Sequence, residues 1–224
     1  MAMFDRMRPG CGRETCSCLE MGVAMREILE GIHCWSRLSQ PHGYDFNGYF
    51  LTLPSGNLVI DPVEPEDGDL KRLVSEGVSE ILLTNRNHSR AANRIREATK
   101  AKTLIHAEDA RHARSQGCEI DGELTPGSRV GPLHVLPAPG KSPGEVVLYW
   151  RERRLAFIGD LVIGNPPGRC SLLPDEKMDD PARLRASVKT LLELELDCLI
   201  MGDGVSITQN AKPVLQDLVS GFTA

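Results

Sequence analysis

The segment PAPGKSPGEVVLYWRERRLAFIGD (137–160) gives the clearest indication of the fold. Its first part is rich in Pro and Gly, which is typical of a loop. Two apolar runs follow, GEVVLYW (144–150) and RLAFIGD (154–160), and both have the composition of buried strands. The charged residues between them indicate a hairpin turn. Because the second run ends at Asp160, we expect a carboxylate at the end of a buried strand.

Upstream of this hairpin, strand-like and helix-like segments alternate. GIHCWSRLS (31–39), DFNGYFLTLP (45–54) and NLVIDP (57–62) are predicted to be neighbouring strands, with a turn at 54–56 between the last two. The segments that follow are a helix over 66–77, a strand over 79–84, a helix opening near Ser89, a strand over 102–106 and a short helix from Ala107 that Gly117 can close.

Downstream of the hairpin, a loop rich in Gly and Pro (163–180) leads to a predicted helix. Asp180 is its expected cap, and Pro181 suits its first turn. A last strand (197–202) precedes a last amphipathic helix. Two sheets packed face to face, with helices outside each, suit this order. The predicted fold is therefore α/β, a four-layer αββα sandwich.

Length and composition indicate one globular domain, placed at 31–224 after an N-terminal extension over 1–30. The 224 residues can bury a sizeable core, and 41% of them are hydrophobic. The net charge of −5 is spread over interleaved charges, so nucleic acid is a poor candidate partner. No run of 18 apolar residues exists and the N-terminus is charged, so we expect neither a signal peptide nor a membrane span, and a cytoplasmic location.

Several segments resemble motifs of the metallo-β-lactamase superfamily, in the family's order. ILLTNRNHSRAANRI (81–95) resembles its strand, Thr and H-x-H-x-D-H ligand motif. The segment 137–164 resembles its P-G-H-T-P-G loop, hairpin and terminal G-D, and LIMGDGVSI (199–207) resembles its last strand with G-H-G. LVIDP (58–62) resembles its early strand that ends in Asp. The resemblance covers roughly residues 31 to 220 and implies a metallo-β-lactamase-like αββα fold.

Carried over residue by residue, the resemblance implies that most metal ligands are replaced. The ligand positions fall, in chain order, on Asn85, Asn87, Ser89, Arg90, Lys141, Asp160 and Asp203. Only Asp160 keeps the family's residue type. Zinc and iron sites in this fold need imidazoles and carboxylates, whereas Arg and Lys offer no lone pair and repel a cation. We therefore expect a degenerate site with no metal cofactor, in which ion pairs stand in place of the metals.

Three functional hypotheses stand beside a purely structural role for these residues. The first is a non-catalytic module or scaffold that binds a small anion through Asn85, Asn87, His88, Arg90, Lys141, Asp160 and Asp203. No catalytic residue is assigned in this case. The second is a remodelled hydrolase of ester, thioester, amide or phosphodiester bonds, with a single zinc or iron held at Asp160 with His88 and Asp203. Its metal-free variant would use Lys141 as base or Ser89 as nucleophile.

The third hypothesis concerns three cysteines near the N-terminus. Cys11, Cys16 and Cys18, with Cys34 as a fourth partner, could serve a metal or redox role, although C-x4-C-x-C is not a standard spacing. Incidental thiols in a tail are the alternative. Among the other candidates, His33 and His42 could reach the rim of the pocket, and Tyr44 is the aromatic residue most favoured to touch a ligand.

Overall fold

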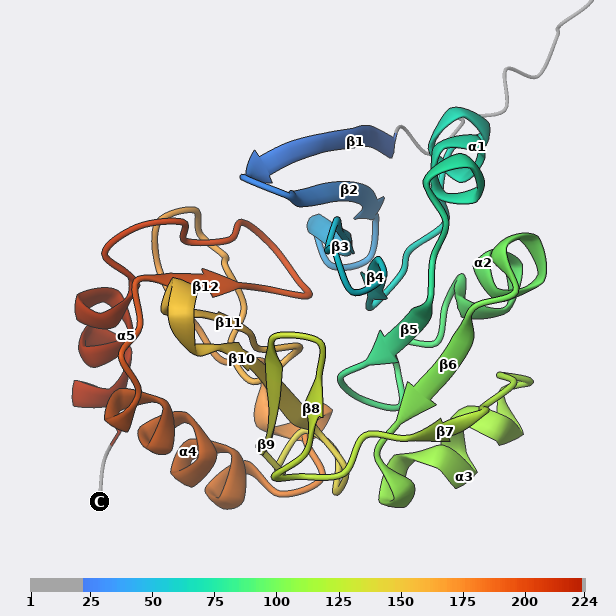
Figure 1. Cartoon of the computed structure of the whole chain (residues 1–224). Helices are drawn as coiled ribbons and strands as arrows, with labels where there is room; N and C mark the ends of the chain where they lie inside the picture. The colour runs from blue at the N-terminus through green and yellow to red at the C-terminus, as the bar shows by residue number, and fades with distance from the viewer. Residues whose placement is uncertain (1–21, 223–224) are drawn as a thin grey trace, which may run out of the picture.

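Two β-sheets pack face to face and carry helices on both outer sides (Figure 1). This computed structural model describes residues 22–222. The first sheet has seven strands in the order β1-β2-β3-β4-β5-β6-β7, and the second has five in the order β12-β11-β10-β9-β8. Helices α1, α2 and α3 cover the first sheet, and α4 and α5 cover the second (Figure 1). The predicted four-layer αββα sandwich is confirmed.

The first sheet is antiparallel from β1 to β4 and parallel from β4 to β7. Its strands and helices are β1 (Gly22–Leu29), β2 (Ile32–Ser39), β3 (Tyr44–Leu51), β4 (Leu58–Ile60), α1 (Asp67–Glu76), β5 (Glu80–Leu83), α2 (Ala92–Thr99), β6 (Lys102–Ile105), α3 (Ala107–Ser115) and β7 (Gly122–Glu123). Each parallel pair is joined through a helix or a long loop, as parallel strands require.

The second sheet is antiparallel except for the pair β11 and β12. Its elements are β8 (Arg129–Val130), β9 (Leu133–Pro137), β10 (Val146–Trp150), the 3₁₀ turn η1 (Arg151–Arg153), β11 (Leu155–Phe157), η2 (Asp175–Lys177), α4 (Pro181–Thr190), η3 (Leu191–Glu193), β12 (Cys198–Ile200) and α5 (Ala211–Ser220). The predicted hairpin is β10–β11, with η1 as its turn.

Three apolar clusters hold the four layers together. One lies between the sheets, where Tyr49 packs edge-on against Phe157 with ring centroids 5.5 Å apart. The second joins the outer face of the second sheet to α4 and α5, and the third joins the first sheet to α1, α2 and α3. Each sheet therefore packs against the other on its inner face and against helices on its outer face.

Most predicted elements are found, with differences at the ends. Asp180 caps α4 by accepting a hydrogen bond from the backbone N–H of Arg183 at 2.9 Å, as expected. The helix predicted from near Ser89 begins at Ala92, because the preceding residues form turns. The short strands β7 and β8 were not predicted. Strand β1 was not predicted either, and it lies within the expected extension, pairing with β2.

Two predictions concern the termini and the membrane. Cys11, Cys16 and Cys18 lie outside the described residues. Within residues 22–222, none of the helices is both long and apolar enough to span a bilayer.

Candidate ligand pocket at the ends of parallel strands

Four loops converge at the carboxyl ends of the parallel strand pairs. Asp61 follows β4, the turn that contains His88 follows β5, Asp160 follows β11, and Asp203 follows β12. Parallel neighbours end at the same edge of a sheet, so each sheet contributes two adjacent loops to one place. Gly202 is needed there, since a Cβ atom on it would lie 2.7 Å from His88 Cε1.

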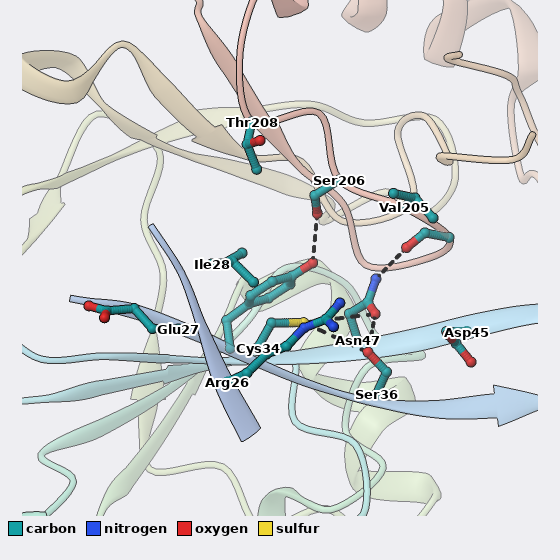
Figure 2. A pocket seen from close by; sticks show the side chains of 12 residues that line it. Arg26, Glu27, Ile28, Cys34, Ser36, Asp45, Asn47, Val205, Ser206 and Thr208 are labelled. Carbon is teal, nitrogen blue, oxygen red and sulfur yellow. Dashed lines mark hydrogen bonds between the residues drawn. The ribbon is translucent and has the colours of Figure 1, made fainter. Parts of the chain in front are cut away.

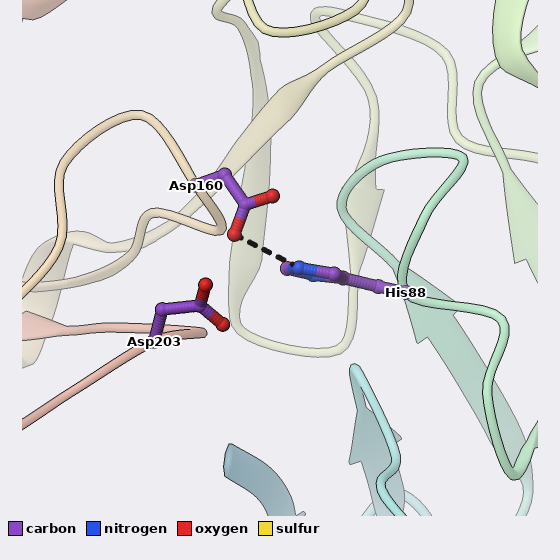
Figure 3. A group of neighbouring side chains, drawn as sticks. All are labelled: His88, Asp160 and Asp203. Carbon is purple, nitrogen blue, oxygen red and sulfur yellow. Dashed lines mark hydrogen bonds and ion pairs between the residues drawn. The ribbon is translucent and has the colours of Figure 1, made fainter. Parts of the chain in front are cut away.

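His88 lies at the centre of this meeting point and is fully buried. Its Nε2 lies 3.0 Å from Asp160 Oδ1, and its Nδ1 lies 3.0 Å from Asp61 Oδ2. Figure 3 shows the imidazole edge pointing at Asp160, with Asp203 alongside. Thr84 fixes the Asp61 carboxylate, because its hydroxyl and its backbone N–H donate to the two oxygens at 2.6 and 2.8 Å. Both ring nitrogens of His88 are thus engaged by carboxylates.

The carboxylates keep His88 positively charged. Burial alone would lower the pKa of His88, but the charges of Asp160 and Asp61 outweigh it and raise this pKa to about 10. Burial would likewise raise the pKa of Asp160, yet the His88 imidazolium holds it well below its usual range. An imidazolium has two donors and no lone pair. In this state His88 cannot coordinate a metal.

Two further cations approach the same carboxylates. Arg90 Nη2 lies 3.5 Å from Asp203 Oδ1, and its guanidinium stacks 4.2 Å above the centre of the Phe46 ring. Lys141 Nζ lies 3.9 Å from Asp160 Oδ2. Burial, together with the charge of Asp160, raises the pKa of Asp203 to about 7. The predicted ion pairs of Arg90 and Lys141 with these two carboxylates are therefore present, and His88, whose part in them was not predicted, lies at their centre.

A cavity of about 330 Å³ opens above this network. One wall is aromatic, the other comes from the loop before α4, and the floor is charged. Its lining residues are His42, Tyr44, Phe46, Asn87, Arg90, Lys141, Asp160, Leu173, Pro174, Lys177 and Asp203. This volume is at the small end of the range for ligand sites, roughly 300–1,000 Å³. The cavity therefore suits a small molecule.

The sequence-predicted residues divide into those that line the cavity and those that support it. Asn87, Arg90, Lys141, Asp160 and Asp203 line it, and His88 lies below its floor. His42 and Tyr44 line it as well, as their positions suggested.

Other candidates lie elsewhere. Asn85 is fully buried and donates from Nδ2 to Glu145 Oε1 at 3.3 Å. Arg86 pairs with Asp179 at 2.6 Å. His33 Nε2 lies 2.9 Å from Arg72 Nη2 of helix α1 and is not part of the cavity lining. Within residues 22–222, no hydrogen bond links Ser89 to a base, so the serine-nucleophile variant gains no support.

Four functional or supporting residues were not singled out from the sequence. Asp61 was recognised only as the end of a family-like strand, and Thr84 only as a motif residue. Lys177 lies in a loop without a recognisable motif. Glu145 is fully buried, and its Oε1 accepts the backbone N–H of Asp160 at 3.0 Å. Burial, helped by the charge of Asp160, raises the pKa of Glu145 well above its ordinary value, which favours the neutral form of this carboxyl group.

A neutral Glu145 leads to a testable expectation. Glu145→Gln keeps an oxygen for Asp160 N and for Asn85, so the free energy of unfolding should change by less than about 1 kcal/mol. Glu145→Ala removes the acceptor and should cost about 1–3 kcal/mol. Urea denaturation of both variants measures the difference. An equal loss in both would mean that Glu145 is ionised.

The donor set does not fit the two-metal centre that the fold implies. The resemblance assigns Arg90 and Lys141 to ligand positions, and neither cation can bind a metal ion. Asn85 donates to Glu145, and both ring nitrogens of His88 lie 3.0 Å from carboxylate oxygens. A single ion is a different matter. One ligand atom from each of His88, Asp160 and Asp203 lies within 4.8 Å of the others, so a neutral His88 would complete a possible three-donor site. The structure therefore does not support the prediction that no metal binds, because these three residues could hold one ion.

A second cavity, of about 460 Å³, lies between strands β1 to β3 and the loop 204–208 (Figure 2). This cavity is larger than the first, but its lining includes none of the charged residues around His88. Its polar groups bond to one another: Ser36 donates to Asn47 Oδ1 at 2.7 Å, and Asn47 donates to the carbonyl of Gly204 at 2.8 Å. Tyr49 donates to the Met201 carbonyl at 2.6 Å. These bonds hold the loop that carries Asp203.

Comparison with known proteins agrees with this geometry. A sequence profile described as the metallo-beta-lactamase superfamily matches residues 28–222. The chain belongs to the metallo-β-lactamase superfamily. The match begins within β1 and includes all four loops of the pocket.

Relatives within the superfamily include metal-bound proteins. The chain is 30% identical over 150 residues to the hydroxyacylglutathione hydrolase of Anaeromyxobacter dehalogenans, a match to 65% of this chain and 55% of that enzyme. This chain thus spans about half the length of its curated relative. The di-iron-bound structure of TTHA1623 is 30% identical, with a TM-score of 0.58 over 75% of this chain and 91% of that one.

The mono-zinc form of the metallo-β-lactamase FIM-1 from Pseudomonas aeruginosa is 16% identical, with a TM-score of 0.70 over 90% of this chain and 96% of that one. At that identity the likeness shows the fold alone.

Proposed function

We propose that this chain uses the superfamily pocket, without a dinuclear metal centre, to bind a small organic anion. The observation that carries the proposal is the group of protein cations around the cavity. His88 bridges Asp61 and Asp160, while Arg90 and Lys141 face the cavity. With Lys177 at the rim, the cations outnumber the ionised carboxylates, because Asp203 is only partly charged near neutral pH. A carboxylate group on a ligand would pair with these cations.

Hydrogen bonding also supports an organic anion. A guanidinium and an ammonium group bind carboxylates through charge-assisted hydrogen bonds, which are about twice as strong as neutral ones. The aromatic wall of Tyr44 and Phe46 and the apolar Leu173 offer contact to a carbon skeleton. Benzoate, which combines one carboxylate with a flat apolar body, is therefore a suitable first probe.

The binding test centres on Arg90. Arg90→Met should weaken benzoate binding by about 10- to 100-fold, because it removes a charge-assisted interaction worth roughly 1.5–3 kcal/mol. Isothermal titration calorimetry measures the change. Arg94→Met is the matched control, since Arg94 pairs with Glu64 and Asp67 at the surface and is outside the cavity. Equal affinities for the two variants and the unchanged chain would remove Arg90 from the proposed site.

A mononuclear hydrolase is the second candidate function. The three clustered donors of His88, Asp160 and Asp203 favour it, as does the di-iron-bound structure of TTHA1623. When bound, such an ion would supply Lewis-acid chemistry, and His88 would have to lose its proton before these residues could hold the ion.

Metal content per chain separates the two candidates. Protein purified without added metal or chelator should contain far less than one zinc or iron per chain by mass spectrometry, and Asp160→Asn should not change this value. One ion per chain that disappears in Asp160→Asn would favour the mononuclear hydrolase instead. A form lacking residues 1–20 serves as the control for the cysteines: metal lost only in that form would belong to Cys11, Cys16 and Cys18.

A further inference from the structure

The floor of the cavity carries a buried acceptor without a donor. Asp203 is only 4% exposed, and its Oδ1 accepts no hydrogen bond from the described residues. Arg90 Nη2 lies 3.5 Å away but does not form a hydrogen bond with it. An unsatisfied buried acceptor costs roughly 1–3 kcal/mol, so a ligand that brought a donor to this oxygen would gain affinity.

The cavity is lined by both negative and positive side chains, and the two carboxylates lie together on its floor. Asp160 and Asp203 form a carboxylate pair on the floor, with one oxygen of each within 4.8 Å of the other. Arg90, Lys141 and Lys177 supply positive charge to the same cavity. A simple anion would pair with the cations but would leave Asp203 Oδ1 without a donor. A simple cation could interact with Asp203 Oδ1 but would leave the cations without a partner.

We infer that the ligand is a zwitterionic α-amino acid. Its carboxylate pairs with Arg90 and Lys141, its ammonium group donates to Asp203 Oδ1, and its side chain lies between Tyr44 and Leu173. This inference rests on the proposed function, because an α-amino acid carries the carboxylate that the proposed function requires and adds an ammonium donor on the adjacent carbon. An ammonium group suits the floor better than a hydroxyl group, because it carries the charge that the two carboxylates attract.

Three matched probes test the inference by calorimetry near pH 7.5: L-phenylalanine, 3-phenylpropionate, which lacks the ammonium group, and 2-phenylethylamine, which lacks the carboxylate. L-leucine and glycine vary the side chain. At least one amino acid should bind about tenfold more tightly than 3-phenylpropionate or the amine, a difference of about 1.4 kcal/mol.

Substitution of Asp203 gives the second measurement. Asp203→Asn keeps the shape of the side chain but removes its charge, so the preference for L-phenylalanine over 3-phenylpropionate should disappear. This variant should fold, because asparagine fills nearly the same volume as aspartate. Asp179→Asn is the control, since Asp179 pairs with Arg86 and does not line the cavity.

The outcomes distinguish failure of the inference alone from failure of the proposed function as well. If 3-phenylpropionate and benzoate bind as tightly as any amino acid, the pocket is a carboxylate site and only the inference is overturned. If the amine alone binds, or if no probe binds, both the inference and the proposed function are overturned. A preference for the amino acid that survives in Asp203→Asn would overturn the role of Asp203.

Discussion

His88→Ala should lower the free energy of unfolding by about 3–5 kcal/mol, the loss expected when one partner of a buried ion pair is removed. The imidazolium lies 3.0 Å from each of Asp61 and Asp160, and both carboxylates are buried. Without His88, these two negative charges would have lost the cation that lies between them. Urea denaturation followed by circular dichroism measures the change.

The control for this substitution is His112→Ala. His112 is exposed on helix α3, and its ring forms a hydrogen bond only with Gln116 among the described residues, so its loss should change stability by less than about 0.5 kcal/mol. A loss below about 1 kcal/mol for His88→Ala would show that the imidazolium is not the group that balances Asp61 and Asp160. Survival of the fold would then have to depend on Arg90 and Lys141.

The fold could be predicted because most of its strands and helices are marked by short local patterns, such as apolar runs and helix caps. The apolar runs at 144–150 and 154–160 form the hairpin β10–β11, and Asp180 caps α4, as their sequences indicate. Strand β1 escaped prediction because it is an edge strand: most of its described side chains face solvent, so its sequence, GVAMREIL, lacks the buried alternation that marks an inner strand. Very short strands such as β7 depend on pairing with distant partners, and sequence patterns do not record this.

The sequence predicted which residues lie in the site, but it did not predict all the contacts between them. The family resemblance placed Arg90, Lys141, Asp160 and Asp203 in one region, and the structure brings them around one cavity. It placed His88 at a motif position that need not face the metals. The contact between His88 and Asp61 joins two loops that follow different strands, so no spacing within either loop reveals it.

Stability should also fall as pH rises above neutrality. The pKa of His88 is about 10 in the folded chain, against about 6.5 for an unperturbed imidazole. Below pH 6.5, both states hold the proton and the full stabilisation is present. Between 6.5 and 10, the folded state binds one proton more than the unfolded state, so the free energy of unfolding decreases by up to about 1.4 kcal/mol per pH unit. The total loss should be at most about 5 kcal/mol.

The window from pH 7 to 8.5 isolates this effect. Asp203, whose pKa is about 7, contributes mainly below it, and buried thiols such as Cys170, whose pKa burial raises to about 11, contribute mainly above it. Urea denaturation across this window should give a negative slope in the unchanged chain and a much smaller slope in His88→Gln, which cannot titrate. Nuclear magnetic resonance gives an independent reading, because the ring signals of His88 should remain those of an imidazolium throughout. A change to the neutral ring near pH 6.5 would remove the positive charge from the centre of the network, and would leave His88 free to act as a metal ligand with Asp160 and Asp203.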